Sequence, residues 1–195
     1  EARTRIENKL SLPEGYVIEG GGQFEHLERS RTRFMIVVPI ALLLIFLMLY
    51  FSLKNFIDVF IIYTGIPFAF IGGVFALWGR GMPFSVSAAV GFIALSGIAV
   101  LNGQILVSTI RMLRKEGLVL DEAVKGAAKQ RLLPVMATAI TDAAGFIPMA
   151  ISTGVGAEVQ RPLATVVIGG VITCTLLTLF VLPALYITIG KQRLA

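Results

Sequence analysis

The sequence has few of the residues that build enzyme active sites and metal centres. Its one cysteine, Cys174, excludes an internal disulfide, and its one histidine, His26, excludes a multi-histidine metal site. No spacing fits a nucleophilic triad, a phosphate-binding loop or a zinc site. The pattern therefore disfavours an enzyme, and we expect no cofactor and no resident metal.

Charge is also scarce, because charged residues make up 15% of the chain against about 25% in ordinary soluble domains. Hydrophobic residues reach 56%, and the mean hydropathy is +0.84. The net charge of +5 could suggest nucleic-acid binding, but the charges lie beside or between long apolar runs. Membrane anchoring explains that placement better, so the chain is predicted to be integral to a lipid bilayer, with no nucleic-acid partner.

Five apolar runs are each long enough for the roughly 20 residues that cross the hydrocarbon core as a helix. Between the third and fourth runs, residues 111–130 show a helical apolar stripe with charges elsewhere, which is typical of a helix lying in the membrane interface. The predicted fold class is thus an all-α integral membrane domain over residues 34–195. Its expected transmembrane helices are about 34–53, 56–78, 84–110, 132–153 and 162–189.

Residues 1–33 form the one sizeable polar segment. Turn signals at Pro13-Glu14-Gly15 precede a short alternating run, Tyr16-Val17-Ile18-Glu19. We interpret the segment as a short α/β remnant, the end of a periplasmic domain, too short to build its own core. The polar start shows no signal peptide and looks like an entry into a longer protein.

The charges next to the membrane predict the orientation of the chain. The positive-inside rule places nine basic residues in the cytoplasm, whereas Arg80 and Arg161 lie on the opposite side. Three arginines before the first run argue the other way. Five crossings put the chain ends on opposite sides, so we expect residues 1–33 outside and the C-terminus inside. The nine residues are Lys54, Arg111, Arg114, Lys115, Lys125, Lys129, Arg131, Lys191 and Arg193.

Small residues recur at four-residue spacing inside the runs, as in Gly72 with Ala76. Such stripes let membrane helices approach closely where no hydrophobic effect drives them together. Prolines inside or near the ends of the runs, including Pro67 and Pro183, predict static kinks. The candidate helix-packing residues are Gly65, Gly72, Gly73, Ala99 and Gly103.

One run carries a polar face. Arg131, Thr138, Asp142 and Gly145 are separated by seven, four and three residues, which places them along one side of a helix. A carboxylate near the membrane midplane costs at least about 2.5 kcal/mol, so we expect this face to point into the bundle. Asn102 lies near the middle of the third run. These groups fit either interhelical hydrogen bonds or a proton pathway, the latter marked most by Asp142.

Three stretches resemble a known family. "SGIAVLNGQILVS", "QRLLPVMATAITDAAGFIPMAISTGVGAEVQRPLATVVIGG" and "LLTLFVLPALY" are similar to the C-terminal membrane half of resistance-nodulation-division pumps. "GAEVQRPLATVVIGG" is the most specific piece, and it resembles the heavy-metal efflux branch of the cobalt–zinc–cadmium type. The resemblance covers essentially the whole chain.

The resemblance implies a proton-driven antiporter that exports heavy-metal cations across the inner membrane of a Gram-negative-type cell. It further implies a homotrimer joined to a periplasmic adaptor (membrane fusion) protein and an outer-membrane channel. The five runs would be the eighth to twelfth of twelve spans, so the chain would be a fragment of a longer pump. Metal ligands of this family lie mainly in parts that the chain does not contain.

The resemblance also implies a set of proton-relay and coupling residues: Asn102, Arg131, Thr138 and Asp142. Arg131 and Thr138 match the arginine and the relay threonine of the eleventh span. Asn102 matches the asparagine after the relay lysine of the drug-exporting branch, but the lysine position is Leu101 here. Asp142 falls where many relatives have a small apolar residue, so its role is a hypothesis.

Two other functions remain open at this point. One is a drug- or solute-exporting pump of the same superfamily, against which Leu101 and "GAEVQRPLATVV" count. The other is a membrane scaffold or protein-export subunit without transport of its own. The presence of paired acidic residues in a fourth span would separate a pump from a scaffold.

Overall fold

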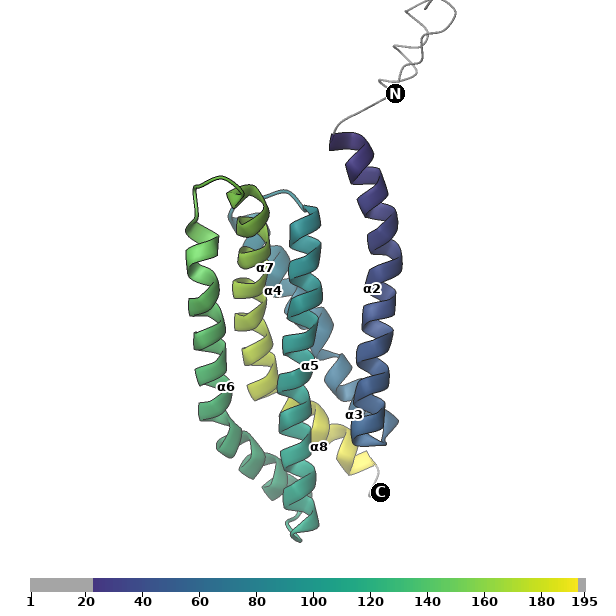
Figure 1. Cartoon of the computed structure of the whole chain (residues 1–195). Coiled ribbons are helices and arrows are strands. Elements are labelled where there is room, and N and C mark those ends of the chain that lie inside the picture. Colours follow the sequence, from purple (N-terminus) through teal and green to yellow (C-terminus); the bar gives the residue numbers. More distant parts are fainter. Residues whose placement is uncertain (1–22, 193–195) are drawn as a thin grey trace, which may run out of the picture. The chain divides into compact units, whose positions relative to one another are not determined.

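The computed structural model describes residues 23–192, and the side chains of residues 35–189. The regular elements within this range are helices, which confirms the all-α prediction. Residues 1–22, where most of the expected α/β remnant falls, lie outside the described residues. The elements are α2 (Gln23–Leu53), α3 (Phe56–Tyr63), α4 (Gly65–Gly79), α5 (Val86–Lys115), α6 (Leu120–Ile151), α7 (Ala157–Leu176), the π-helical η1 (Leu177–Val181) and α8 (Leu182–Gln192) (Figure 1).

Five stretches of helix are long and apolar enough to cross a membrane, as the five runs predict. Four of them begin and end within about five residues of the expected limits, whereas the fourth begins at Leu120, 12 residues before the expected start at 132. Helices α3 and α4 together make the second stretch, and α7, η1 and α8 together make the fifth. The candidate spans are Met35–Leu53, Phe56–Gly79, Val86–Lys115, Leu120–Ile151 and Ala157–Ile189.

The expected helix over residues 111–130 is not a separate element. Its first part forms the end of α5, which stops at Lys115, and its second part forms the start of α6. Gly117, with φ of +96°, makes the turn between them. The apolar stripe has a packing role here, because Leu120, Ala123 and Val124 are buried in the core. The first turns of α6 run at an angle to the rest (Figure 1), and Pro134 supplies the kink because its ring displaces the carbonyl four residues earlier.

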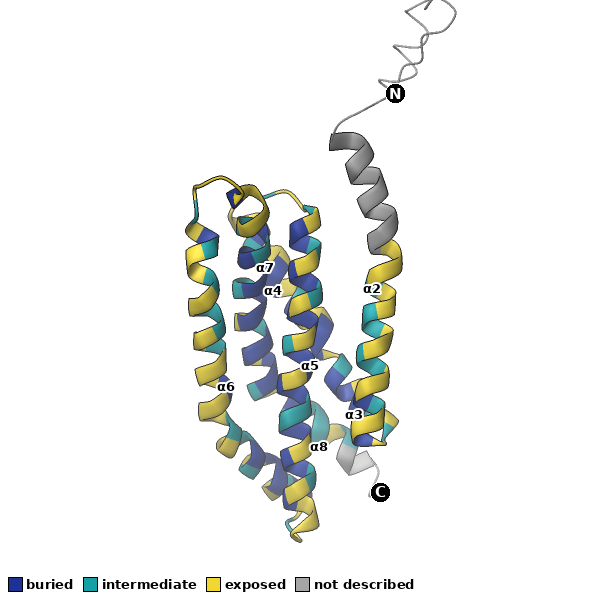
Figure 2. Ribbon diagram, viewed as in Figure 1, coloured by how far each residue is buried: buried dark blue, intermediate teal, exposed yellow. Residues whose placement is uncertain are grey.

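The chain divides into two compact units, residues 1–37 and 38–195, and the described part of the first is the start of α2. In the second unit α7 is the central helix, packed against α4, α5 and α6. Most of α7 is buried, whereas α6 is exposed along most of its length (Figure 2). Small side chains make the burial of α7 possible, and its buried residues include Ala164, Val166, Val167, Gly170, Val171 and Cys174.

Two of the predicted kinks occur at prolines. The second span breaks at Thr64, three residues before Pro67, where a regular helix would need the missing proline N–H. The fifth span widens into η1 immediately before Pro183, and the backbone N–H of Leu182 donates to the carbonyl of Leu177, five residues back. A π-helical turn gives the proline ring room that a regular turn lacks.

The connections fall at two ends of the second unit. The turn between α2 and α3, the turn between α5 and α6 and the last turns of α8 lie at one end (Figure 1). The connections α4–α5 and α6–α7 lie at the other end. The basic residues Lys54, Arg114 and Lys115 therefore share one end, while Arg80 and Arg161 share the opposite one, as the charge pattern predicts.

Candidate functional site

Asn102 is buried on α5 with 7% of its surface exposed. Its side chain lies near the thiol of Cys174 on α7. The hydroxyl of Thr178 on η1 lies 4.0 Å from the same sulfur and donates to the Cys174 carbonyl at 2.9 Å. A small polar cluster of Asn102, Cys174 and Thr178 thus crosses from α5 to the π-helical turn inside an otherwise apolar core.

Arg131 lies half-buried at the kinked start of α6. Its Nε donates a hydrogen bond of 2.8 Å to the hydroxyl oxygen of Thr109 on α5. Thr109 is almost fully buried and donates its own hydrogen to the Ile105 carbonyl at 2.9 Å. This bond ties the guanidinium of α6 to the neighbouring helix.

Among the helices that the structure describes, the polar face of α6 does not point wholly into the bundle. Thr138 and Gly145 are exposed, and the Thr138 hydroxyl donates to the Val135 carbonyl of its own helix at 3.0 Å. The reason is which side of α6 packs inward: Ala139 and Phe146 pack against the core, and they lie about 80–100° around the helix from Thr138. The polar face therefore lies along the border of the buried side.

Asp142 lies one turn from both Ala139 and Phe146, so it is half-buried at that border. Within the described part of the chain, no hydrogen bond joins Asn102 to Arg131, Thr138 or Asp142. The four sequence-predicted residues consequently form two groups, one around Asn102 inside the core and one along the edge of α6.

A buried ion pair was not predicted from the sequence. Asp58, 3% exposed at the start of α3, receives hydrogen bonds from Arg111 Nε at 2.6 Å and from Asn55 at 3.3 Å. Arg111 also donates to the Leu53 carbonyl at 2.5 Å, which caps the end of α2. One signal was present in the sequence: Asp58 lies at the start of the second apolar run and Arg111 directly after the third, so two opposite charges fall at the same end of neighbouring spans.

The opposite end of the second unit is tied by Arg80. Its guanidinium donates to the Thr165 hydroxyl at 2.7 Å and to the Ala150 carbonyl at 2.8 Å. These bonds join the end of α4 to α7 and α6. At each end of the helix bundle, an arginine thus joins neighbouring helices through hydrogen bonds.

The predicted packing glycines lie at close helix crossings. A Cβ placed on Gly72 would come within 2.6 Å of the Gly169 carbonyl oxygen, and one on Gly73 within 2.6 Å of the Phe92 ring. A Cβ on Gly103 would meet Ile62 at 3.0 Å, and one on Gly65 would meet Leu177 at 3.3 Å, while Ala99 is buried. The sequence analysis did not single out Gly169, which faces Gly72, or Gly170, whose added Cβ would meet Leu95, although "VVIGG" contains both glycines.

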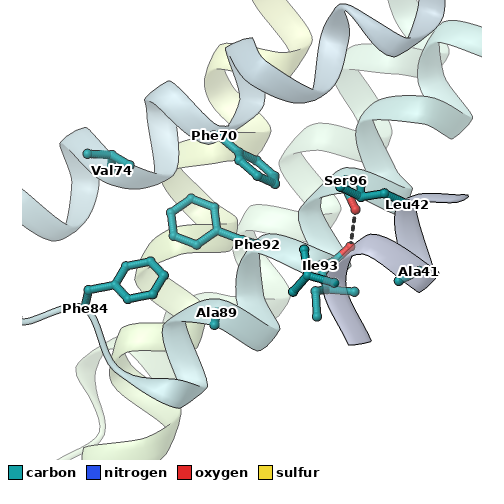
Figure 3. Close-up of a pocket in the computed structure, with 10 residues that line it drawn as sticks. Ala41, Leu42, Phe70, Val74, Phe84, Ala89, Phe92, Ile93 and Ser96 are labelled. Atoms are coloured by element: carbon teal, nitrogen blue, oxygen red, sulfur yellow. Dashed lines mark hydrogen bonds between the residues drawn. The ribbon is translucent and has the colours of Figure 1, made fainter. Parts of the chain in front are cut away.

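A cavity of about 200 Å³ lies between α2, α4 and α5 (Figure 3). Phe70, Phe84 and Phe92 form much of its wall, and its one hydroxyl, on Ser96, donates to the Ile93 carbonyl at 2.6 Å. One hydroxyl oxygen in an otherwise apolar wall is too few ligands to hold a cation. Among the described residues no three histidine, cysteine or carboxylate side chains gather closely enough to hold a metal ion.

With this arrangement in view, the similarity to known proteins decides the family. The model of the AcrB/AcrD/AcrF family matches residues 1–190. The chain belongs to this family. The predicted resemblance to resistance-nodulation-division pumps is thereby confirmed.

Relatives with curated names place the chain within the family. The cobalt-zinc-cadmium resistance protein CzcA of Cupriavidus metallidurans is 55% identical over 186 residues, which cover 95% of the chain and 18% of CzcA. The nickel and cobalt resistance protein CnrA of the same organism is 51% identical over 195 residues, covering 100% and 18%. The cation efflux system protein CusA of Escherichia coli K12 is 35% identical over 192 residues, covering 93% and 18%.

A solved structure agrees with these relatives. An X-ray crystal structure of a heavy metal efflux pump superposes with a TM-score of 0.81 and 44% sequence identity, covering 97% of this chain and 19% of that chain. The predicted resemblance to the heavy-metal branch is thereby confirmed. The chain spans less than a fifth of the length of these relatives, so it corresponds to one part of such a pump.

Proposed function

We propose that this chain is the C-terminal membrane part of a proton-driven antiporter that exports heavy-metal cations such as Co²⁺, Zn²⁺ and Cd²⁺. The observation that carries the proposal is the match over 97% of the chain to a heavy metal efflux pump at 44% identity. Three relatives with more than 50% identity are named as cobalt-zinc-cadmium, nickel and cobalt, and nickel-cobalt-cadmium resistance proteins, and these names support the same cargo.

The border position of the α6 polar face fits this function. Only 6% of the apolar window of α6 is buried, against 56% for the span that contains α7. Arg131, Thr138 and Asp142 lie along this open edge. We propose that the remaining helices of the pump cover the edge and bring acidic side chains to it, so that protons pass along α6 and bias two arrangements of the bundle.

Asn102 has a different place in the proposal. Its amide lies in the core beside Cys174 and Thr178, next to the π-helical turn. The π-helical turn η1 joins α7 to α8. A rearrangement of the polar cluster would therefore change the direction of α8 relative to α7. Asn102 is therefore assigned to coupling between helices, and Arg131, Thr138 and Asp142 to the proton path.

The whole pump is proposed to be a homotrimer in the bacterial inner membrane, joined to a periplasmic adaptor (membrane fusion) protein and an outer-membrane channel. In this assembly residues 1–33 face the periplasm, and the C-terminus lies in the cytoplasm. The gathering of Lys54, Arg114 and Lys115 at one end of the helix bundle supports this orientation.

The experiment is a resistance assay with the full-length pump that contains this segment. Expression in a metal-sensitive Gram-negative strain, together with its adaptor and channel, should raise the tolerated concentration of Co²⁺, Zn²⁺ or Cd²⁺ and lower the metal content of the cells. Tolerance of drugs without tolerance of metals would instead favour a drug-exporting pump. If the cells gain tolerance of neither drugs nor metals, a scaffold is favoured.

Asp142→Asn is the matching test of the proton path. The substitution keeps the shape of the side chain and removes its ability to carry a proton, so metal tolerance should fall toward that of the strain without the pump. Thr141→Val, at the neighbouring exposed position, is the control and should keep tolerance within about twofold. Unchanged tolerance for Asp142→Asn at equal expression would remove Asp142 from the path.

A further inference from the structure

Thr109 is a buried hydroxyl at the crossing of α5 and the kinked start of α6. Only 2% of its surface is exposed. It is one of the buried threonines of the described chain, and the Arg131 guanidinium of the neighbouring helix donates a 2.8 Å hydrogen bond to it. Its neighbours along α5, Leu106 and Ile110, belong to one buried apolar cluster, which also contains Ala127 of α6.

The hydrogen bonding of Thr109 has one direction. A hydroxyl has one hydrogen to donate, and Thr109 gives it to the Ile105 carbonyl one turn back on its own helix. The oxygen can therefore only accept from Arg131, and the bond from Nε satisfies it. The helix backbone thus fixes the hydroxyl, and the hydroxyl fixes the arginine.

Fixing Nε also orients the rest of the guanidinium. The group is planar and its donors are held in a rigid fork, so a bond at Nε restricts where Nη1 and Nη2 can point. A lysine at this position has a single point charge on a flexible stem and would lack this restriction. The bond therefore supplies direction, which the charge alone does not.

We propose that Thr109 is a positioning residue for proton coupling: it holds the Arg131 guanidinium in the orientation that the coupling step uses. The inference rests on the proposed function, in which Arg131 lies on the proton path. The positioning role belongs to the hydroxyl oxygen of Thr109, and the methyl group of Thr109 has no part in it.

The test uses the full-length pump containing this segment, purified, reconstituted in proteoliposomes and driven by an imposed pH gradient. Zn²⁺ flux is measured over a range of Zn²⁺ concentrations to give a maximal rate and an apparent KM. Thr109→Val keeps the shape and removes the acceptor, so the maximal rate should fall about tenfold with KM unchanged. Thr109→Ser keeps the hydroxyl and should retain the rate within about twofold.

Thr175→Val is the matched control. Thr175 is also buried, and its hydroxyl also donates back along its own helix, to the Val171 carbonyl at 2.7 Å, but within the described residues no arginine donates to it. Its variant should keep the rate within about twofold. Arg131→Lys should lower the maximal rate as Thr109→Val does, and combining the two should lower it no further, because both remove the same orientation.

The outcomes separate the two proposals. Four results would overturn the positioning role and leave the proposed function standing. For Thr109→Val they are a wild-type maximal rate, or a rise in KM instead of a fall in rate. The others are an equal loss of rate in Thr109→Ser, and a further loss when Thr109→Val is added to Arg131→Lys. A wild-type pump with no proton-driven Zn²⁺, Co²⁺ or Cd²⁺ flux would overturn the proposed function, and the positioning role with it.

Discussion

The crossing of α4 and α7 can be tested by adding one methyl group. Gly169 on α7 faces Gly72 on α4, and a Cβ on Gly169 would lie 2.7 Å from the Gly72 carbonyl oxygen and would also overlap Ala76. Heavy atoms essentially never approach a Cβ closer than 3.0 Å. The obstacle on α4 is backbone, so no rotation of a side chain can relieve it. Gly169→Ala must therefore push the two helices apart.

The magnitude follows from two opposing effects. Overpacking of a tight contact costs about 1–3 kcal/mol. Replacing glycine by alanine inside a helix gains about 0.5–1 kcal/mol, because alanine has less conformational freedom to lose. The net effect of Gly169→Ala is a loss of about 1–2 kcal/mol of stability. Gly97→Ala is the control, because Gly97 lies inside α5 with nothing within 4 Å of its added Cβ, and it should gain the helix contribution alone.

The assay compares both variants of the full-length pump in detergent. Each sample is heated, and the temperature at which half of the protein is lost from the size-exclusion peak is recorded. Gly169→Ala should lower this temperature, and Gly97→Ala should leave it equal or raise it. Equal temperatures for Gly169→Ala and Gly97→Ala would refute the close contact of α4 and α7, because both variants make the same chemical change.

The same assay tests the two arginine ties. Asp58→Asn should lower stability by about 3 kcal/mol, the low end of the range for breaking a buried ion pair, because the Arg111 side chain is 30% exposed. Adding Arg111→Met to Asp58→Asn should recover part of the lost stability. No recovery would contradict the ion pair. Arg80→Met should cost about 1–2 kcal/mol by removing the charged hydrogen bonds to Thr165 and Ala150, whereas Lys115→Met, at an exposed position, should change stability by less than about 0.5 kcal/mol.

The fold was largely predictable because the bilayer sets the length of each apolar run. A run of about 20 apolar residues is stable in lipid as a transmembrane helix, so five such runs predict five crossings. The ends of the helices were less predictable. Leu120, Ala123 and Val124 give an amphipathic stripe whether that stripe faces lipid headgroups or a protein core, and only the tertiary contacts show that it faces the core.

The site was predictable in part. Helical spacing predicted that Arg131, Thr138 and Asp142 lie along one side of a helix, but spacing does not say which side of α6 packs inward. Phe146 and Ala139 decided that, and left Thr138 exposed. The hydrogen-bond partners of these residues on other helices could not be predicted from the sequence. The bond from Arg131 to Thr109 joins residues 22 apart, and neither residue type nor spacing identifies such a pair.

The central claim is that this bundle couples proton movement to metal export, and one measurement tests it directly. The full-length pump containing this segment is reconstituted in liposomes that hold a Zn²⁺ indicator and a pH indicator, and a pH gradient is imposed. Zn²⁺ should move against its own gradient while protons move the opposite way, and an uncoupler should stop both. Zn²⁺ movement that is the same with and without the proton gradient would contradict the account.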